Sequence, residues 1–428
     1  MSKLEELIKE FCPNGVEYKP LWSLTAWDKR FNGIDRSMQK KVVSYKYYLS
    51  SEFNEVERKD GDILYIPTGI TNEKRYTTEE LAGEYLAEGE IVCIPWGGTP
   101  NVKYHKGKFV TGDNRIATSL DTNILDNKYL YYWMQSKIDL IASFYRGAGI
   151  QHPSMKSVLE LQIPLPALPV QREIVRILDS FTLYSAELTA ELTARRKQYE
   201  FYRDKLLKFD SGNIPRVKLK DIATEFYRGY GITREQVTKE GIPCVRYGEI
   251  YTTYNTWFDK CVSYTKVEDI ASPKYFEYGD ILFAITGESV EDIAKSAAYI
   301  GNEKCLAGGD IVVMKHKQNP KFLAYALSTF DARQQKSKGK IKSKVVHSNV
   351  PSIENIEIYL PPIDVQERIV KVLDNFDAIC SDLGIGLPAE IEKRQKQYEY
   401  YREKLLTFDG KYATILTERN GTERNGQG

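Results

Sequence analysis

The sequence predicts an α+β protein with two related α+β domains, separated by long helices that pair as an antiparallel coiled coil. Its 428 residues are too many for one ordinary core and favour two to three domains. A helical segment occurs twice, about two hundred residues apart. Outside the two copies, glycine punctuates short β-branched and aromatic runs such as "GDILYIPTG" and "GDILFAITG", which is typical of strands in α+β domains.

The repeat has two parts. "RRKQYEFYRDKLLKFD" (195–210) and "RQKQYEYYREKLLTFD" (394–409) are identical at 12 of 16 positions. "LPALPVQREIVRILDSF" (165–181) and "LPPIDVQERIVKVLDNF" (360–376) are identical at 9 of 17 positions. The order along the chain is therefore variable block, shared segment, variable block, shared segment.

Identical residues in this repeat include Gln171 and Gln366, and Asp179 and Asp374, each pair separated by 195 positions. The same separation pairs His152 with His347. Farther upstream the match is confined to islands, in which "GEIVCI" resembles "GDILFA" and "NKYLYYW" resembles "PKFLAYA". Upstream of the shared segments, the similarity between the two variable blocks is therefore limited to these islands.

The shared segments carry a helical period. From Ile174 to Phe209, largely apolar positions step by 4 and 3, which indicates a heptad seam. Some 40 residues at about 1.5 Å each predict a rod of roughly 60 Å. In the second segment, Pro388 and neighbouring glycines interrupt the pattern, and four residues are inserted. We expect a helix over about 365–383 and a longer one over about 388–408.

These patterns set the expected boundaries. The predicted segments are 1–166 (first domain), 167–210 (central helix), 211–361 (second domain), 362–410 (C-terminal helices) and 411–428 (tail). Because "TERNGTERNGQG" has no apolar residue, we expect the tail to be disordered.

Composition narrows the class of protein. The formal net charge of +1 argues against a surface that is basic throughout, but it leaves room for a local basic groove. We find no signal peptide and no run of about 20 apolar residues. The six scattered cysteines read as reduced thiols, so the predicted location is cytoplasmic, and the four histidines lack the spacing of a metal site.

No catalytic motif stands out in the sequence. There is no Walker loop, no G-x-G-x-x-G after a strand, no nucleophile elbow and no H-E-x-x-H. We therefore predict no catalytic residue, no metal site and no cofactor bound by this chain. A nuclease or methyltransferase with a divergent site is the rival interpretation.

Basic and aromatic residues gather near the ends of both variable blocks. The stretch "ARQQKSKGKIKSKVVH" has no acid between Asp331 and Glu354, and its alternating lysines suit phosphate contact from a strand face or a loop. "SFYRGAGIQHPSMKS" is the equivalent place in the first block. The predicted DNA-binding residues are Arg146, Gln151, His152, Arg228, Tyr230, Arg246, Arg333, Lys336, Lys338, Lys340, Lys342, Lys344 and His347. Solvated surface loops are the alternative interpretation.

A second cluster, rich in glutamine, tyrosine and arginine, occurs once in each shared segment. Its members, the predicted partner-binding residues, are Gln198, Tyr199, Tyr202, Arg203, Gln397, Tyr398, Tyr401 and Arg402. They could pack the long helices on each other, or they could dock another protein. The duplication favours docking, because two equal surfaces imply two copies of one partner.

The shared segments resemble the conserved regions of the specificity (S) subunit of Type I restriction-modification systems. The resemblance rests on "VQREIVRILDSF" with "KQYEFYRDKLLKF", and on "VQERIVKVLDNF" with "KQYEYYREKLLTF". It covers both shared segments closely and the whole chain in layout. The Gly/Pro interruption and the four inserted residues of the second copy depart from it, and so does the short repeated tail.

The resemblance implies a subunit without an active site that gives DNA recognition to two modification (methyltransferase) and two restriction (motor and nuclease) subunits. Each variable block would be a target recognition domain that reads one half of a bipartite double-stranded DNA site. The paired helices would be a ruler and a dock for the modification subunits. Adenine would be the methylated base, and S-adenosylmethionine, ATP and Mg would be bound by partner subunits.

The residues lead to a similar expectation independently. Two related halves imply pseudo-two-fold symmetry, and their different sequences imply an asymmetric target. A rod of roughly 60 Å limits the site to about 18 base pairs. A coiled-coil scaffold without a DNA role and a silent cassette that donates recognition domains remain the alternatives.

Overall fold

The structure is a computed structural model that describes residues 2–71, 73–209, 212–290, 292–336, 340–342, 345–381 and 386–408. These residues form two compact units. Unit 1 combines the residues up to Glu187 with those from Ile391 onward, and unit 2 comprises those from Leu188 to Glu390. The units follow contacts in space, whereas the five predicted segments follow chain order, so those boundaries stay a prediction. The predicted disorder of the tail lies outside the described residues.

Unit 1 contains one large sheet with helices around it. Its helices are α1 (Lys3–Phe11), α2 (Leu21–Leu24), α3 (Ser50–Val56), α4 (Glu79–Ala82), α5 (Asn127–Ser136), α6 (Ile138–Ala142), α7 (Met155–Leu159) and the first part of α8 (Leu168–Leu206), with 3-10 turns η1 (Arg36–Gln39) and η2 (Gly83–Tyr85). Its strands are β1 (Glu17–Pro20), β2 (Thr25–Trp27), β3 (Ile63–Ile66), β4 (Arg75–Thr77), β5 (Ala87–Pro95), β6 (Lys103–Thr111), β7 (Asn114–Ser119), β8 (Tyr145–Arg146), β9 (His152–Pro153) and β10 (Gln162–Leu165).

The sheet of unit 1 has the strand order β2-β7-β5-β6-β3-β4. The run "IVCIP" in β5 is buried on both faces, as expected for the centre of a covered sheet. Helix α5 packs its aromatic side chains into the main core of the unit. Beside the sheet, β1 pairs with β10 antiparallel, which ties the start of the block to the strand that precedes α8.

Unit 2 repeats this plan with more strands. Its strands are β11 (Arg216–Lys218), β12 (Ala223–Arg228), β13 (Val237–Thr238), β14 (Ile242–Val245), β15 (Trp257–Phe258), β16 (Ser263–Thr265), β17 (Tyr275–Phe276), β18 (Ile281–Ala284), β19 (Thr286–Gly287), β20 (Ser296–Tyr299), β21 (Cys305–Ala307), β22 (Ile311–His316), β23 (Lys340–Lys342), β24 (Val345–His347) and β25 (Glu357–Tyr359). Its helices are the second part of α8, α9 (Leu219–Ile222), α10 (Tyr247–Thr252), the turn η3 (Val267–Asp269), α11 (Pro320–Ser328), α12 (Phe330–Lys336), α13 (Val350–Glu354), α14 (Ile363–Ser381) and the start of α15 (Leu387–Leu406).

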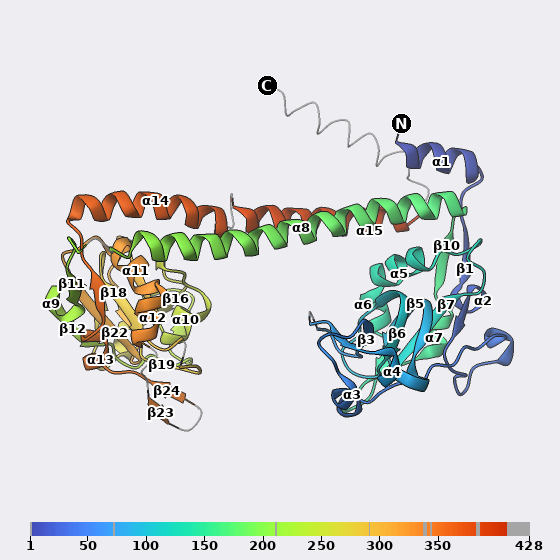
Figure 1. The fold of residues 1–428 in the computed structure, drawn as a ribbon, viewed down its shortest axis with the longest axis horizontal. Helices are drawn as coiled ribbons and strands as arrows, with labels where there is room; N and C mark the ends of the chain where they lie inside the picture. Colours follow the sequence, from blue (N-terminus) through green and yellow to red (C-terminus); the bar gives the residue numbers. More distant parts are fainter. Residues whose placement is uncertain are drawn as a thin grey trace. The chain divides into compact units, whose positions relative to one another are not determined.

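The sheets of unit 2 have the orders β12-β22-β18-β20-β15, β13-β16-β14-β21-β17 and β19-β24-β23. Strand β11 pairs with β25 just as β1 pairs with β10, so both blocks close their ends in the same way. The islands predicted to match lie at equivalent places, in β5 and β18 and in α5 and α11. Within unit 2, α14 lies on one side and the β23–β24 hairpin on the opposite side (Figure 1).

The long helices agree with the prediction. Helix α8 has 39 residues, and α14 and α15 begin and end within two residues of the predicted bounds. In unit 1 the ring of Phe181 stacks on Tyr401 at 5.6 Å, and Arg394 lies over the ring of Tyr184 at 5.2 Å. Because the later residue of α8 meets the earlier residue of α15, the two helices run antiparallel, as predicted.

The predicted seam is wrong in the last turns of α8. The buried residues at this end are Tyr199 and Arg203 of α8 and Leu207 just after it, at intervals of four, whereas Leu206, a predicted seam position, is exposed. This end of α8 packs against the core of unit 2, and a straight helix of 3.6 residues per turn presents a four-residue stripe to a globular surface. Among the described residues, no helix is long and apolar enough to span a membrane.

Candidate functional site

Three residues predicted from separate segments of unit 2 surround one cavity. Arg228, Tyr230 and Arg246 line a hollow of about 750 Å³. Arg228 forms an ion pair with Asp310, and Arg246 with the buried Glu249. The two guanidinium groups are therefore held in place, and the exposed Tyr230 lies beside them.

The lysine-rich segment forms a strand, as one of its two predicted conformations. In β23, Lys340 and Lys342 occupy alternating positions, and Lys340 pairs with His347 of β24. His347 also pairs with Thr286 of β19. Arg333 is exposed on α12. Lys338 and Lys344 lie outside the described residues.

Lys336 does not fit the DNA interpretation. Its side chain is buried, and its Nζ donates to Ser296 Oγ at 2.9 Å and to the Leu327 carbonyl at 2.8 Å. Burial, with a smaller contribution from Arg333, lowers the pKa of Lys336 to about 7. Since Leu327 is in the last turn of α11, Lys336 closes the end of that helix and cannot reach a phosphate. A charge run in sequence does not reveal which of its members turns inward.

The cavity and the hairpin lie at the same end of unit 2. The amide of Ile285, which follows β18, donates to the Asp310 carbonyl at 2.9 Å. The amide of Ser348, which follows β24, donates to the Ile285 carbonyl at 2.9 Å. Residues predicted from three segments are thus gathered at one end of the central sheet. The β23–β24 hairpin at this end lies on the side away from α14 (Figure 1).

Unit 1 has an equivalent arrangement. The two-residue strands β8 and β9 pair Arg146 with His152. His152 Nδ1 lies 2.8 Å from the Trp96 carbonyl, and its ring lies 4.9 Å from the indole. Gln151 is exposed, and its carbonyl accepts the amide hydrogen of Gly98 at 3.3 Å. The three predicted residues of this block therefore lie together, next to the end of β5.

The two sites correspond in one backbone hydrogen bond and in the place of the repeated histidine. The amide of Trp96 donates to the Asp113 carbonyl at 3.0 Å, which matches the bond from Ile285 to Asp310. In each unit the repeated histidine stands opposite a basic residue, Arg146 in one case and Lys340 in the other. The repeat of His152 and His347 in the sequence therefore marks the same structural place.

Sequence reasoning missed the support of the unit 1 site. Arg115 is buried, bonds to Asp113 at 2.9 Å and lies 4.2 Å over the Trp96 ring. Asp28 Oδ1 accepts the amide hydrogen of Ile116 at 3.0 Å, and its carboxylate lies 3.9 Å from Arg115. Burial raises the pKa of Asp28 to about 6. The glycine-aspartate pairs at 112–113 and 309–310 are the signal that could have pointed to these loops.

The predicted partner-binding cluster is mostly internal to each unit. Tyr199 and Arg203 are buried in unit 2, and Tyr202 stacks on Phe376 at 6.0 Å. In unit 1, Tyr398 donates to Gln135 at 3.2 Å.

The remaining members of the cluster also have partners within the chain. Tyr401 stacks on Phe181, and Arg402 lies 5.4 Å over the Tyr398 ring. Gln198 and Gln397 accept hydrogen bonds from the arginines three residues earlier, at 3.2 and 3.1 Å. These contacts fit the packing interpretation for most of the cluster.

The exposed aromatic residues of the repeat lie between the predicted ones. Phe201 and Tyr400 are equivalent and exposed. Each makes an edge contact with the tyrosine that follows it, at 5.4 Å and 75° in both units. Lys205 and Lys404 lie over these rings at 6.0 and 5.6 Å. We call Phe201 with Lys205, and Tyr400 with Lys404, the aromatic–lysine pairs.

The repeated glutamines attach each long helix to its block. The Nε2 of buried Gln171 donates to the carbonyls of Pro166 and Ile124, and its Oε1 accepts the amide hydrogen of Asp126. Buried Gln366 repeats this with the Pro361 carbonyl and the Asn319 amide.

The repeated aspartates complete the attachment. Asp179 accepts from Tyr132 at 2.6 Å and pairs with Lys128 at 2.8 Å. Asp374 accepts from Tyr325 at 2.6 Å and pairs with Lys321 at 2.8 Å. The distances agree between the units. We call the glutamine and aspartate with these partners the helix clamp. The sequence repeat identified the glutamines and aspartates, but it did not show that they attach the long helix to its block.

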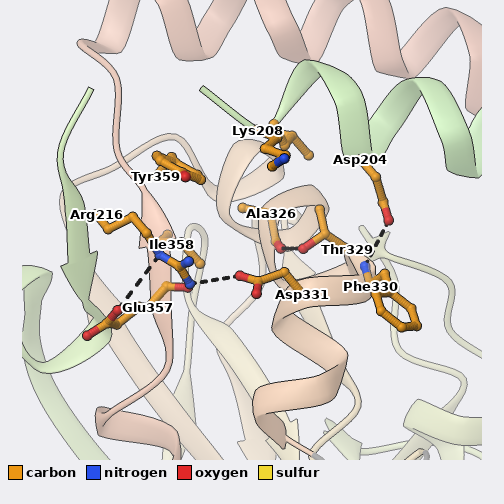
Figure 2. A pocket seen from close by; sticks show the side chains of 11 residues that line it. Asp204, Lys208, Arg216, Ala326, Thr329, Phe330, Asp331, Glu357, Ile358 and Tyr359 are labelled. Carbon is orange, nitrogen blue, oxygen red and sulfur yellow. Dashed lines mark hydrogen bonds and ion pairs between the residues drawn. The ribbon is translucent and has the colours of Figure 1, made fainter. Parts of the chain in front are cut away.

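The end of α8 borders a cavity of about 270 Å³ in unit 2 (Figure 2). Asp204 accepts the amide hydrogen of Phe330 at 3.0 Å, and the Phe330 ring is exposed. Arg216 pairs with Asp331 at 2.8 Å and with Glu357 at 3.7 Å. The bond from Phe330 to Asp204 attaches the end of α8 to the second block, and the Arg216 ion pairs lie within that block.

Fold and sites define a protein of two pseudo-repeated units, each with a basic end and a clamped helix. The family model described as the Type I restriction modification DNA specificity domain matches residues 43–195 and 214–393. The chain is 31% identical over 369 residues to the Type I restriction enzyme EcoR124I/EcoR124II specificity subunit of Escherichia coli, covering 82% of this chain and 90% of the relative. The chain therefore belongs to the family of Type I restriction-modification specificity subunits.

Two solved structures share the fold. One is the S subunit of a Type I restriction-modification system from M. genitalium, with a TM-score of 0.52, 18% identity, and coverage of 92% of this chain and 97% of that chain. The other comes from work on complex assembly and conformational transition of the type I R-M system, with a TM-score of 0.57, 14% identity, and coverage of 93% and 99%. At these identities the likeness bears on the fold alone.

Proposed function

We propose that this chain is the DNA-reading subunit of a Type I restriction-modification complex and that it recognises an asymmetric target in two parts. Unit 1 reads one half through the end that carries Arg146, Gln151 and His152. Unit 2 reads the other half through the Arg228–Arg246 cavity and the β23–β24 hairpin. The lysines contribute phosphate contacts, and the held arginines can contact base edges.

One observation carries this proposal. The same end of the sheet in both units presents a histidine opposite a basic residue, next to the loop after the central strand. The frame is repeated while the side chains on it differ, because Trp96 stands where unit 2 has Ile285. Two units with the same backbone arrangement but different side chains at the basic end suit two half-sites of different sequence.

The proposal includes partners and assigns the chemistry to them. Two modification subunits dock on the two shared segments, and two restriction subunits join through them. S-adenosylmethionine, ATP and Mg belong to those subunits, and this chain contributes no catalytic group. The duplicated aromatic–lysine pairs support two equal docking positions.

The direct test maps methylated adenines in genomic DNA from cells with and without this chain, with the modification subunit present in both. We expect one asymmetric two-part motif with a fixed gap to lose its methylation when the chain is deleted. An unchanged map would contradict the proposal. Co-purification with the methyltransferase would then separate a silent cassette, which still assembles, from a scaffold that does not.

A further inference from the structure

The two most exposed large apolar side chains among the described residues are both isoleucines of unit 1. Ile150 is 69% exposed and Ile70 is 68% exposed. Isolated apolar residues on a surface are ordinary, so exposure alone decides nothing. What distinguishes these two isoleucines is their position in unit 1.

Both isoleucines lie on loops joined to the loop after β5. Ile150 lies in the β8–β9 hairpin, between Arg146 and His152. A Cβ atom on Gly97 would lie 2.7 Å from Ile150 Cγ2, so the loop backbone at Gly97 lies against this side chain. The neighbouring amide of Gly98 donates to Gln151.

The Ile70 loop is fastened to the other side of the same loop. Asn101 Nδ2 donates to the carbonyls of Thr68 and Thr99, both at about 3 Å. Lys103 Nζ donates to the Thr68 carbonyl at 3.0 Å. The chain segments that carry Ile70 and Ile150 therefore converge at the end of unit 1 that holds the predicted DNA-binding residues.

Charge identifies the ligand that these loops suit. Residues 63–72, 91–112 and 140–159 contain no aspartate or glutamate, although acids make up 59 of the 428 residues. The exposed charged groups of the hairpin region, Arg146 and Lys156, are basic. Acids border these stretches along the chain, among them Asp62 and Glu73 beside the Ile70 segment; Asp113, beside the loop after β5, is paired with Arg115 and Lys29. Exposed basic groups beside two apolar tips suit a polyanion that also offers apolar groups, which is the character of DNA bases between phosphates.

We propose that Ile70 and Ile150 are the apolar contacts of unit 1 with the bases of its half-site, on the thymine methyl group or against an opened base step. This inference rests on the proposed function and specifies how unit 1 contributes to it. Apolar contact with a methyl group discriminates base pairs in the major groove, and aliphatic wedges unstack steps in the minor groove. Unit 2 presents Tyr230 and Tyr247 at its cavity instead, so the two halves would read their bases by different chemistry.

The test measures binding of the complex of the full chain with its modification subunits to the duplex found by methylation mapping, over a range of salt concentrations. We expect Ile70→Ala and Ile150→Ala each to weaken binding about tenfold without changing the dependence on salt, because apolar contacts release no counterions. Arg146→Ala should reduce the salt dependence. Ile124→Ala, an exposed isoleucine in the turn before α5 at the other end of β7, is the matched control and should bind like the wild type.

Deoxyuridine in place of thymine locates the contact. If the substitution weakens the wild type but not the isoleucine variants further, the contact is the methyl group. If it has no effect while the variants remain weak, the contact is a base step; both results support the proposal. Isoleucine variants that bind like the wild type would overturn the role proposed for these two isoleucines, but not the proposed function of the chain. A wild-type complex that binds no duplex would overturn the proposed function as well.

Discussion

At the scale of single residues, the helix clamp explains why certain polar residues recur in a chain whose blocks differ. Gln171 and Gln366 are buried, and each bonds a backbone amide of its block and the carbonyl of a proline just before the helix. Unsatisfied buried polar groups cost about 1–3 kcal/mol each, so the residue type is tightly constrained. The repeat exposed these residues in the sequence, but only the structure assigns them a role.

Tyr325→Phe should weaken the clamp of unit 2. Burial raises the pKa of Tyr325, and its bond to the Asp374 carboxylate raises it further, so the hydroxyl stays protonated and donates. Losing a hydrogen bond to a charged acceptor costs about 1.5–3 kcal/mol. Hydrogen–deuterium exchange in α11 and α14 should quicken correspondingly. The exposed Tyr278, changed to Phe, is the control, and equal exchange in both variants would contradict the prediction.

Asp28 predicts a pH effect on unit 1. Its pKa in the folded chain, about 6, lies above the ordinary 3.8, so the folded state retains this proton longer than the unfolded state. The stability from this group is present at low pH and is lost as pH rises through about 6. Asp28→Asn keeps an acceptor for the Ile116 amide without the charge. It should match the wild type near pH 4 and exceed it by on the order of 2–3 kcal/mol at pH 7.5 in urea unfolding.

A variant of Asp28 that is less stable than the wild type at pH 7.5 would show instead that the attraction to Arg115 outweighs the cost of burial.

Neither result could be expected from the sequence, in which Asp28 is one acid among many. The same limit applied to Lys336, whose predicted phosphate contact the structure rules out. Burial of a charged side chain depends on contacts between distant segments, such as Lys336 with Ser296.

At the scale of elements, local sequence patterns predicted the secondary structure better than they predicted which single side chains are buried. Heptad spacing predicted the long helices, and prolines predicted their starts, because both signals are confined to neighbouring residues. The antiparallel pairing was predicted from the duplication. The last turns of α8 differ because they pack against the core of the second block as well as against α14. The alternating lysines left a strand and a loop both open, and they could not show that the strand at 340–342 is connected to β19 through β24 and His347.

The β23–β24 hairpin carries a prediction at this scale. Replacing Lys338, Lys340 and Lys342 with Ala should weaken DNA binding for all sequences and flatten the logarithmic salt dependence by up to about 2.7, at about 0.9 per phosphate contact. Filter binding or fluorescence anisotropy over a salt series measures this slope. Lys317→Ala, an exposed lysine at the other end of β22, should leave it unchanged. An unaltered slope in the triple variant would exclude the hairpin from phosphate contact.

At the scale of the whole molecule, each unit contains pieces of both shared segments. Unit 1 has the start of α8 and the end of α15, with Leu406 in its core, and unit 2 has the end of α8, with Leu207 in its core. Leu207 and Leu406 are equivalent in the repeat. The duplication in the sequence predicted the pseudo-two-fold relation between the two halves. It could not show that Leu207 and Leu406, at the ends of the two copies, are buried.

The aromatic–lysine pairs predict the number of partners. Phe201→Glu and Tyr400→Glu should each remove one modification subunit from the assembled complex, and the double variant should remove both, because a charge replaces an exposed ring. Native mass spectrometry counts the subunits. Tyr278→Glu, also on an exposed ring, should retain two. Full occupancy in the double variant would place the docking surface elsewhere.

The helix clamp also bears on how such chains change over time. Because Gln171 and Gln366, and Asp179 and Asp374, hold their blocks through matching bonds, a block from one position meets the same attachment at the other. Exchange of whole blocks between genes, or between the two halves of one gene, would preserve the helices and everything that assembles on them. New specificities could then arise by recombination in a single step, without any adjustment of the machinery that acts on the DNA.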